Sequence, residues 1–392
     1  MQKFDAFTGN LAIATAMKQI NPDVCAAYPI TPSTEIMMLF ADFVANGEVD
    51  TELVTVESEH SAMSACIGAS LAGGRVMTAT SSAGLAYMWE LLSVASGLRC
   101  SMVMTLVNRA LSAPLNIHCD HSDAMGTKDT GWIQLFSENA QEAYDNVIQA
   151  VRITEHKDVR LPVMVCVDGF IISHSYEKMQ YMEDKDVKDF IGEFKPYRSL
   201  LNVEKPETFG AMVLPNYYME FKRQVREGME KARKVILEVG KEFGDRFGRY
   251  YGYFEDFMLD DAEIVFVVMN SAAGTVKHVV NMLRKKGIKV GLLKPRVFRP
   301  FPSKEMADAL RNAKVVCVLD RAETFGGEGG SLYLETKSAL QTAKNNVTVI
   351  NRIYGLGQRD FLPTHVDDIY KEMQEFLNTG NIKLFDYVNL RD

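Results

Sequence analysis

The stretch Tyr28-Pro29-Ile30-Thr31-Pro32-Ser33-Thr34 marks the junction between an apolar strand, predicted over residues 24–28, and a helix, predicted over residues 33–46. Its two prolines exclude helix at the strand end, and Pro32 pushes Thr31 toward extended backbone. Thr31 is therefore predicted to be the N-cap of the helix. An alternative role for its hydroxyl, together with the free N–H groups of a helix start, is to bind a carboxylate.

Short apolar strands alternate with helical segments on both sides of this junction. Up to residue 170 we predict helices at 9–20, 33–46, 59–73, 85–98 and 140–155 and strands at 24–28, 53–56, 75–80, 101–107 and 162–167. The alternation resumes with strands at 264–269, 290–293, 315–319 and 347–350 and helices at 274–286, 303–311, after Gly330, and at 366–378. This order predicts an α/β protein with doubly wound parallel sheets covered on both faces.

A segment of different character separates the two alternating regions. Residues 175–215 are polar and interrupted by prolines, and residues 217–247 form one long helical pattern with an apolar stripe. We interpret the two as a connecting or interface segment. The chain is therefore predicted to have a first domain over 1–240, ending in a linker helix, and a second over 260–392.

The composition excludes several classes of protein. Lys and Arg number 43 against 51 Asp and Glu, and the net charge of -8 argues against an electrostatically driven nucleic-acid binder. No apolar run approaches the roughly 20 residues of a membrane span, and the first residues lack the apolar core of a signal peptide. We expect a cytoplasmic protein whose partners are small molecules and other proteins.

The cysteines predict no metal site on this chain. There are six of them, scattered without a C-x-x-C pair, which excludes a zinc knuckle or a self-contained iron–sulfur cluster. They are expected to be reduced thiols in the core.

Two charged residues are placed where a catalytic site is expected. Glu59 follows a strand and opens a helix, where the helix dipole alone would explain a carboxylate. Arg109 follows the strand 101–107 and has the fork geometry that binds a carboxylate, although an ordinary surface ion pair would explain it equally well. Both roles remain open at this point.

Two further segments have alternative interpretations. The run His118-Cys119-Asp120-His121-Ser122-Asp123 is spaced too tightly for a standard zinc site, so we interpret it as a loop that hydrogen-bonds a polar substrate or fixes Arg109. The glycine-rich segments 326–330 and 355–359 complete neither G-x-G-x-x-G nor a P-loop, and tight turns at helix entries explain them.

Taken together, the motifs of this chain resemble the α subunit of the pyruvate:ferredoxin oxidoreductases, which are thiamine diphosphate enzymes. The matching motifs occur in the family's order over nearly the whole chain: Tyr-Pro-Ile-Thr-Pro-Ser-Thr at 28–34, Ser-Glu at 58–59, Thr-Ser-Ser-Ala-Gly at 80–84, Arg-Ala-Leu at 109–111, Asp-His-Ser-Asp at 120–123, Thr-Gly-Trp at 130–132, Asp-Gly-Phe at 168–170 with Ser173-His174, and Arg-Pro-Phe-Pro at 299–302.

The resemblance implies specific roles for these residues. Residues 1–240 would form the pyrimidine-binding domain of the thiamine fold, and 260–392 a domain similar to the C-terminal domain of transketolase. Glu59 would hold N1′ of the aminopyrimidine ring, and the catalytic residues would be Glu59, Thr31 and Arg109. The other cofactor-binding residues would be Tyr28, Pro29, Ile30 and Ser82, and the substrate-binding residues would be Thr31, Arg109, Asp120 and His121.

The resemblance also implies partners. The chain lacks the Gly-Asp-Gly and following asparagine that hold magnesium and diphosphate in thiamine enzymes. A β subunit is therefore expected to carry the Mg²⁺ site and a [4Fe-4S] cluster, with γ and δ subunits, coenzyme A and ferredoxin completing the system. The chain alone would be inactive.

The loop after Arg109 resembles the pyruvate type of the family. Relatives that act on 2-oxoglutarate or branched-chain oxoacids tend to have Gly-rich and Pro-rich loops there, and Thr31 speaks against oxalate. Pyruvate is thus the expected substrate, with 2-oxobutyrate, 2-oxoisovalerate, 2-oxoglutarate and oxalate as alternatives. A non-catalytic scaffold subunit is the alternative of a different class.

Overall fold

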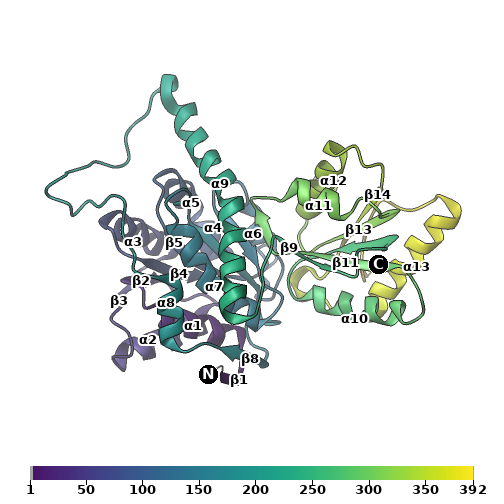
Figure 1. The fold of residues 1–392 in the computed structure, drawn as a ribbon, viewed down its shortest axis with the longest axis horizontal. Helices are drawn as coiled ribbons and strands as arrows, with labels where there is room; N and C mark the ends of the chain where they lie inside the picture. The colour runs from purple at the N-terminus through teal and green to yellow at the C-terminus, as the bar shows by residue number, and fades with distance from the viewer. Residues whose placement is uncertain (1–2, 392) are drawn as a thin grey trace.

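Two parallel-rich β-sheets form the centres of two lobes in the computed structural model, which describes residues 3–391 (Figure 1). The first sheet has seven strands in the order β12-β6-β7-β5-β4-β2-β3, and the second has six in the order β15-β14-β13-β10-β11-β9. Only β12 with β6 and β11 with β9 pair antiparallel within these sheets, over the described residues. Helices pack on both faces of the first sheet. The predicted doubly wound α/β class is confirmed.

The first lobe extends to the end of the long helix α9. Its strands are β1 (Lys3–Phe7), β2 (Val24–Ala27), β3 (Glu52–Thr55), β4 (Val76–Thr80), β5 (Met102–Asn108), β6 (Ile133–Phe136), β7 (Val163–Asp168) and β8 (Glu177–Tyr181). Its helices are α1 (Gly9–Ile20), α2 (Thr34–Ala45), α3 (Glu59–Ala72), α4 (Ser82–Tyr87), α5 (Trp89–Gly97), α6 (Ser122–Gly126), α7 (Ala140–Glu155), α8 (Asp184–Ile191) and α9 (Pro215–Phe247). β1 and β8 form a separate antiparallel pair.

The second lobe contains the rest of the chain. Its strands are β9 (Phe254–Phe257), β10 (Ile264–Val267), β11 (Val290–Pro295), β12 (Val297–Arg299), β13 (Val315–Asp320), β14 (Thr348–Ile353) and β15 (Phe385–Tyr387). Its helices are α10 (Ala272–Arg284), α11 (Ser303–Ala309), α12 (Ser331–Thr342) and α13 (Pro363–Thr379), with a short 3-10 turn at Leu356–Gln358.

The predicted elements are present with small shifts at their ends, except that the helix predicted over 85–98 is two helices. These helices, α4 and α5, meet at Met88. Several strands and helices were not predicted from apolar spacing. Most of these missed elements are short or partly exposed, so their sequences have no sustained apolar period. The missed elements are β1, β6, β8, β9, β12, β15, α6 and α8.

The prediction that Thr31 is the N-cap of α2 is wrong. The helix begins at Thr34, with Ser33 in the cap position. Both the backbone N–H and the hydroxyl of Ser33 donate to the carbonyl oxygen of Ile30, at 2.9 and 2.8 Å. A turn therefore separates strand and helix, which leaves Thr31 exposed at the rim of the sheet.

The two lobes share a core and a strand. β12 belongs by sequence to the second lobe, yet it completes the first sheet by pairing with β6. One apolar cluster runs through both lobes and includes Trp132, Phe136, Phe298 and Val316. A buried ion cluster adds to it, in which Lys294 Nζ of β11 lies 2.7 Å from Glu138 of the first lobe. The lobes are thus joined by packing as well as by the chain.

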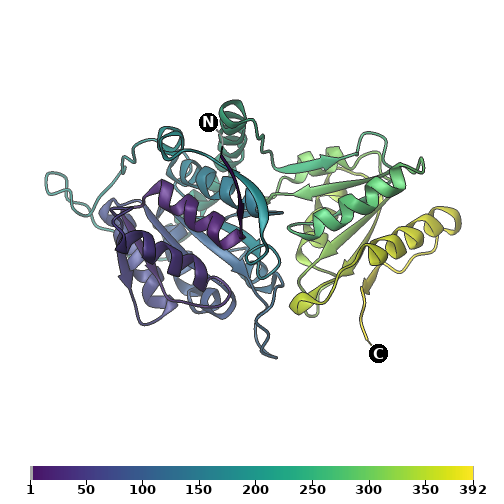
Figure 2. The ribbon, with the colours of Figure 1, turned by 90° about the horizontal axis from the view of Figure 1, so that it is seen from below.

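An extended arm projects from the first lobe. It consists of residues 193–214 and the first turns of α9, and in Figure 1 it extends well beyond the sheet. The rest of α9 buries Ala232, Val235, Ile236 and Val239 against the first lobe. Figure 2 shows the same two lobes and arm from below. The long helix predicted over 217–247 is confirmed.

All six cysteines are buried and unpaired, as predicted for reduced core thiols. Over residues 3–391, none of the helices combines the length and apolar character needed to cross a bilayer.

Candidate active site

The parallel strands of the first sheet end at one edge, and the predicted site residues follow those ends. Thr31 follows β2, Glu59 follows β3, Ser82 follows β4, Arg109 follows β5, and Asp168 is the last residue of β7. The carboxyl edge of such a sheet is the usual position of a ligand. These five residues therefore lie along one edge of the first sheet.

Glu59 is the first residue of α3. The helix start is capped by Ser58, whose hydroxyl accepts from the backbone N–H of Ser61 at 3.1 Å. The Glu59 residue is only 8% exposed, and among residues 3–391 its carboxylate has no hydrogen-bond or ion-pair partner. The carboxylate is therefore unpaired within the described chain and available to a polar partner from outside it.

Gly84 of α4 leaves the space that this carboxylate occupies. A Cβ at residue 84 would lie 2.8 Å from Glu59 Oε1 and 2.5 Å from Thr80 Oγ1, closer than carbon can approach either atom. The hydroxyls of Thr80 and Ser81 are also buried without a hydrogen-bond partner. Gly84 and the unpaired hydroxyl of Thr80 thus lie beside the Glu59 carboxylate.

Arg109 and Thr31 lie together. The guanidinium of Arg109 donates from Nη1 to the carbonyl oxygen of Thr31 at 2.9 Å and from Nε to the carbonyl oxygen of Asn116 at 3.2 Å. Arg109 is 8% exposed and has no carboxylate partner within the described chain. A surface ion pair, the alternative left open by the sequence, does not explain its position.

The remaining predicted cofactor residues differ in exposure. Tyr28 and Pro29 are exposed at the end of β2, and Ile30 is half-buried in the turn before α2. Ser82 is fully buried, and its hydroxyl donates to the carbonyl oxygen of Ala110 at 2.6 Å. Ser82 therefore joins the loop after β4 to the loop after β5.

Asp123 connects the start of α4 to the end of β5. Its Oδ2 accepts from the backbone N–H groups of Ser82 and Arg109, both at 3.0 Å, and its Oδ1 accepts from Asn108 Nδ2 at 2.8 Å. Burial raises the pKa of Asp123 to about 6 against the lowering effect of these hydrogen bonds. The motif at 120–123 was quoted from the sequence, but this residue was not among the predicted site residues.

Asp120 and His121 face other protein groups. Asp120 Oδ1 accepts from the backbone N–H of Ser122 at 3.0 Å and from its hydroxyl at 2.5 Å. His121 is 2% exposed, and its Nε2 lies 2.7 Å from Asp168 Oδ1. The alternative in which this segment fixes Arg109 has direct support in Asp123, which binds the Arg109 N–H.

Asp168 lies at the contact between the two lobes. Arg321, which follows β13 in the second lobe, donates from Nη1 to Asp168 Oδ2 at 2.7 Å, and Asn270 and Ser271 of the same lobe also donate to Asp168. Burial alone would raise the pKa of Asp168, but Arg321 and His121 outweigh it and hold the pKa well below its usual range. No sequence signal marked Arg321.

Cys119, His121 and Asp168 bring three possible metal-ligand atoms within 4.8 Å of one another. These groups already satisfy each other, since His121 and Arg321 hold both oxygens of Asp168. Burial, followed by the charge of Asp168, raises the pKa of the Cys119 thiol well above its usual range. The cluster therefore resembles a structural polar network more than an open metal site.

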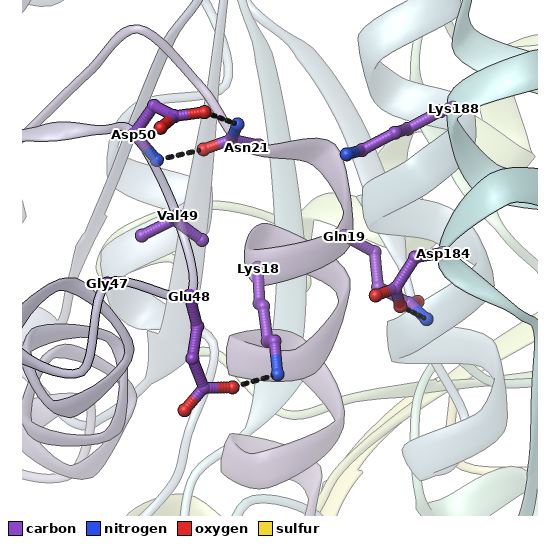
Figure 3. Close-up of a pocket in the computed structure, with 9 residues that line it drawn as sticks. All are labelled: Lys18, Gln19, Asn21, Gly47, Glu48, Val49, Asp50, Asp184 and Lys188. Atoms are coloured by element: carbon purple, nitrogen blue, oxygen red, sulfur yellow. Dashed lines mark hydrogen bonds and ion pairs between the residues drawn. The ribbon is translucent and has the colours of Figure 1, made fainter.

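Two cavities lie away from the site rim. One, of about 120 Å³, is drawn in Figure 3. It is at the amino ends of β2 and β3, the opposite edge of the sheet, and its Lys18–Glu48 and Asn21–Asp50 contacts pair its polar groups. The other, of about 900 Å³, lies between the arm, α5 and α9. Neither includes Glu59, Thr31 or Arg109.

Comparison with known families agrees with this geometry. The thiamine-diphosphate-binding domain of pyruvate flavodoxin/ferredoxin oxidoreductases matches residues 15–241, and pyruvate:ferredoxin oxidoreductase core domain II matches residues 262–366. The chain belongs to the pyruvate:ferredoxin oxidoreductase family. Its first lobe therefore contains a thiamine diphosphate-binding domain of an oxidoreductase.

Several relatives match this family member over nearly its whole length. Pyruvate synthase subunit PorA of Thermotoga maritima is 53% identical over 94% of this chain and 93% of its own length. Pyruvate synthase subunit PorA of Methanocaldococcus jannaschii is 47% identical over 94% of each chain. Ketoisovalerate oxidoreductase subunit VorA of Pyrococcus abyssi is 45% identical over 96% of this chain and 94% of its own.

Solved structures share the fold at low sequence identity. The 2-oxoglutarate:ferredoxin oxidoreductase from Magnetococcus marinus matches with a TM-score of 0.74 at 19% identity, covering 94% of this chain and 65% of that chain. A split gene transketolase matches with a TM-score of 0.55 at 11% identity, covering 95% of this chain and 99% of that chain. The expected transketolase-like arrangement of this family member is thereby confirmed at the level of fold.

Proposed function

We propose that this chain is the α subunit of a pyruvate:ferredoxin oxidoreductase. The reaction converts pyruvate, coenzyme A and oxidised ferredoxin to acetyl-CoA, carbon dioxide and reduced ferredoxin, reversibly. The observation that carries the proposal is the buried carboxylate of Glu59, which has no partner within residues 3–391 and lies in a family-matched thiamine diphosphate-binding domain.

Glu59 fits the aminopyrimidine end of thiamine diphosphate. Its carboxylate is the group that would share a proton with ring nitrogen N1′, and Gly84 leaves the room that this carboxylate occupies. When bound, the cofactor supplies the carbon nucleophile and electron sink for decarboxylation of a 2-oxoacid. Tyr28, Pro29 and Ile30 at the end of β2 would contact the cofactor, with Ser82 holding the neighbouring loop.

Thr31 and Arg109 would bind the substrate carboxylate. The Arg109 guanidinium is held beside Thr31 by one hydrogen bond and has no carboxylate partner within the described residues, so it is available for an anion. Because that carboxylate leaves as carbon dioxide, these contacts must orient it without stabilising it more in the ground state than in the transition state. Asp120 and His121 would act indirectly, by holding in place the loop that carries Arg109.

The proposal includes partner subunits. The sequence has no Gly-Asp-Gly motif for magnesium and diphosphate, so a β subunit would provide that half of the site together with an iron–sulfur cluster. Subunits of the γ and δ type would complete the path to ferredoxin in a cytoplasmic complex. The segments 1–240 and 260–392 are proposed as the pyrimidine-binding and transketolase C-terminal-like domains.

A second substrate has specific support. The identity of the chain to a ketoisovalerate oxidoreductase subunit, 45%, is close to its 47% identity to a pyruvate synthase subunit. The loop after Arg109 favours pyruvate. Rates of the purified complex with pyruvate, 2-oxobutyrate, 2-oxoisovalerate, 2-oxoglutarate and oxalate would separate these substrates.

The central experiment replaces Glu59 by Gln in the assembled complex. We expect pyruvate-dependent dye reduction to be lost while the subunits still assemble, because the amide cannot exchange a proton with N1′. Glu375→Gln, at an exposed position of α13, is the matched control and should leave the rate unchanged. Full turnover by Glu59→Gln would remove this residue from the proposed role.

A further inference from the structure

The turn Gly355-Leu356-Gly357 of the second lobe contacts the loop that carries Arg109 in the first. Gly357 O accepts from Asn116 Nδ2 at 3.1 Å, and the next residue, Gln358, donates its backbone N–H to Cys119 O at 2.7 Å. The sequence explained this glycine-rich segment only as a tight turn. In the structure it is a contact between residues 241 positions apart.

Asn116 is the link between this turn and the site. Its side chain donates to Gly357, while its backbone carbonyl oxygen accepts from Arg109 Nε at 3.2 Å. The loop is closed at its base, because the N–H of Ala110 donates to His118 O at 2.9 Å. The direction of the Arg109 guanidinium therefore depends on where Asn116 is held.

The two glycines of the turn are required by their surroundings. Gly355 has φ +62° and Gly357 φ +55°, a backbone region that side chains disfavour. A Cβ at Gly357 would overlap Asn116 Nδ2, and a Cβ at Gly355 would lie 2.9 Å from Arg321 Nε. Arg321 is itself fixed by its ion pair with Asp168. The turn thus contacts Arg321 through Gly355 and Asn116 through Gly357.

We propose that the Gly355–Gly357 turn is a positioning element for substrate binding, which acts through Asn116 to aim Arg109 at the carboxylate of the 2-oxoacid. This inference rests on the proposed role of Arg109. A guanidinium that binds a carboxylate in two parallel hydrogen bonds needs a defined plane, so its supporting contacts determine the substrate requirement. Glu59 lies on a different loop and is not in this chain of contacts.

The test is Gly357→Ala in the assembled complex. We expect the KM for the 2-oxoacid to rise about 10- to 100-fold, with the affinity for thiamine diphosphate unchanged. Gly380→Ala is the matched control, because Gly380 has a similar φ of +75° but a Cβ there would have nothing within 4 Å. Gly380→Ala imposes a similar backbone strain, but its Cβ overlaps no other atom, so this variant should leave the KM for the 2-oxoacid unchanged.

A double variant separates positioning from general damage. Asn116→Ala removes the atom that a Cβ at residue 357 would overlap, so Asn116→Ala/Gly357→Ala should have the same KM as Asn116→Ala alone. Additive effects of the two changes would overturn the inference, and so would an unchanged KM in Gly357→Ala.

A crystal structure of the Gly357→Ala complex gives a readout that does not depend on turnover. We expect the Arg109 guanidinium to leave the carbonyl oxygen of Thr31, and an unmoved guanidinium would contradict the inference. If the wild-type complex oxidises none of the 2-oxoacids, the proposed function fails, whereas the position of Arg109 in this variant still decides whether the turn positions it.

Discussion

Gly84 and Glu59 are in contact at the carboxyl edge of the first sheet, so that a Cβ at residue 84 would lie 2.8 Å from Glu59 Oε1 and 2.9 Å from its Cγ. The two residues come from the starts of α4 and α3, which follow β4 and β3, two strands that flank β2 in the sheet. The absence of a side chain at one position thus determines where the carboxylate of the other can lie.

Gly84→Ala should displace the Glu59 carboxylate and weaken the binding of thiamine diphosphate by about tenfold or more. Overpacking of the buried contact should also lower the free energy of unfolding by about 1–3 kcal/mol. Gly68→Ala on α3 is the control, because a Cβ there meets nothing within 4 Å. Cofactor affinity is measured by titration of the assembled complex, and equal affinity of Gly84→Ala and wild type would contradict the prediction.

Arg109→Ala should raise the KM for pyruvate about 10- to 100-fold, since a charge-assisted pair of hydrogen bonds to the carboxylate is lost. The cofactor affinity should not change, because Arg109 contacts Thr31 and Asn116 and not Glu59. Steady-state dye reduction over a pyruvate series measures the effect. Arg311→Ala, at an exposed position of the second lobe, is the control. A wild-type KM in Arg109→Ala would mean that the carboxylate binds elsewhere.

Asp168→Asn should lower the free energy of unfolding of the full chain by about 3–5 kcal/mol, because it leaves the buried guanidinium of Arg321 without its counter-charge. Arg321→Met should cost a similar amount. The double variant should lose clearly less than the sum of the two, since each single change breaks the same pair. Urea unfolding measures all three, and strictly additive losses would show that the two side chains are not coupled.

Asp320→Asn should change how stability depends on pH. Burial raises the pKa of Asp320 to about 6, although the N–H groups of Leu332 and Tyr333 at the start of α12 and the Asn351 side chain favour the charged form. The folded state therefore holds this proton more tightly than the unfolded state, and the group's contribution to stability falls as pH rises from about 4 to about 6.

The free energy of unfolding of wild type minus that of Asp320→Asn should accordingly fall as pH rises over that range and stay constant above it. Because the other titrating groups are the same in both proteins, the difference isolates this carboxyl. Unfolding at a series of pH values measures it. If wild type instead gained stability relative to Asp320→Asn between pH 4 and 6, the folded state would favour the charged form of Asp320.

Much of the fold follows from local patterns. The apolar strands and helical stripes predicted α1, α7 and α9 closely, because a buried face must repeat with the period of its element. The common edge on which Glu59, Thr31 and Arg109 lie could also be predicted, because all parallel strands of one sheet end at the same edge. The true N-cap of α2, Ser33, could not be predicted in this way. The turn before the helix depends on a hydrogen bond from Ser33 to the carbonyl oxygen of Ile30, which competes with a helix that begins directly after Thr31.

The sequence by itself thus determined the two α/β regions, the strand ends that carry Glu59, Thr31 and Arg109, and the family motifs. Only the tertiary structure decided that Gly84 adjoins Glu59, that Asp168 pairs with Arg321 across 153 positions, and that Gly357 supports Arg109 through Asn116. The physical reason is the distance along the chain over which each effect acts. Periodicity and turn chemistry involve only a few neighbouring residues. The partner of a buried charge, or the neighbour of a glycine, is determined only when distant segments pack together.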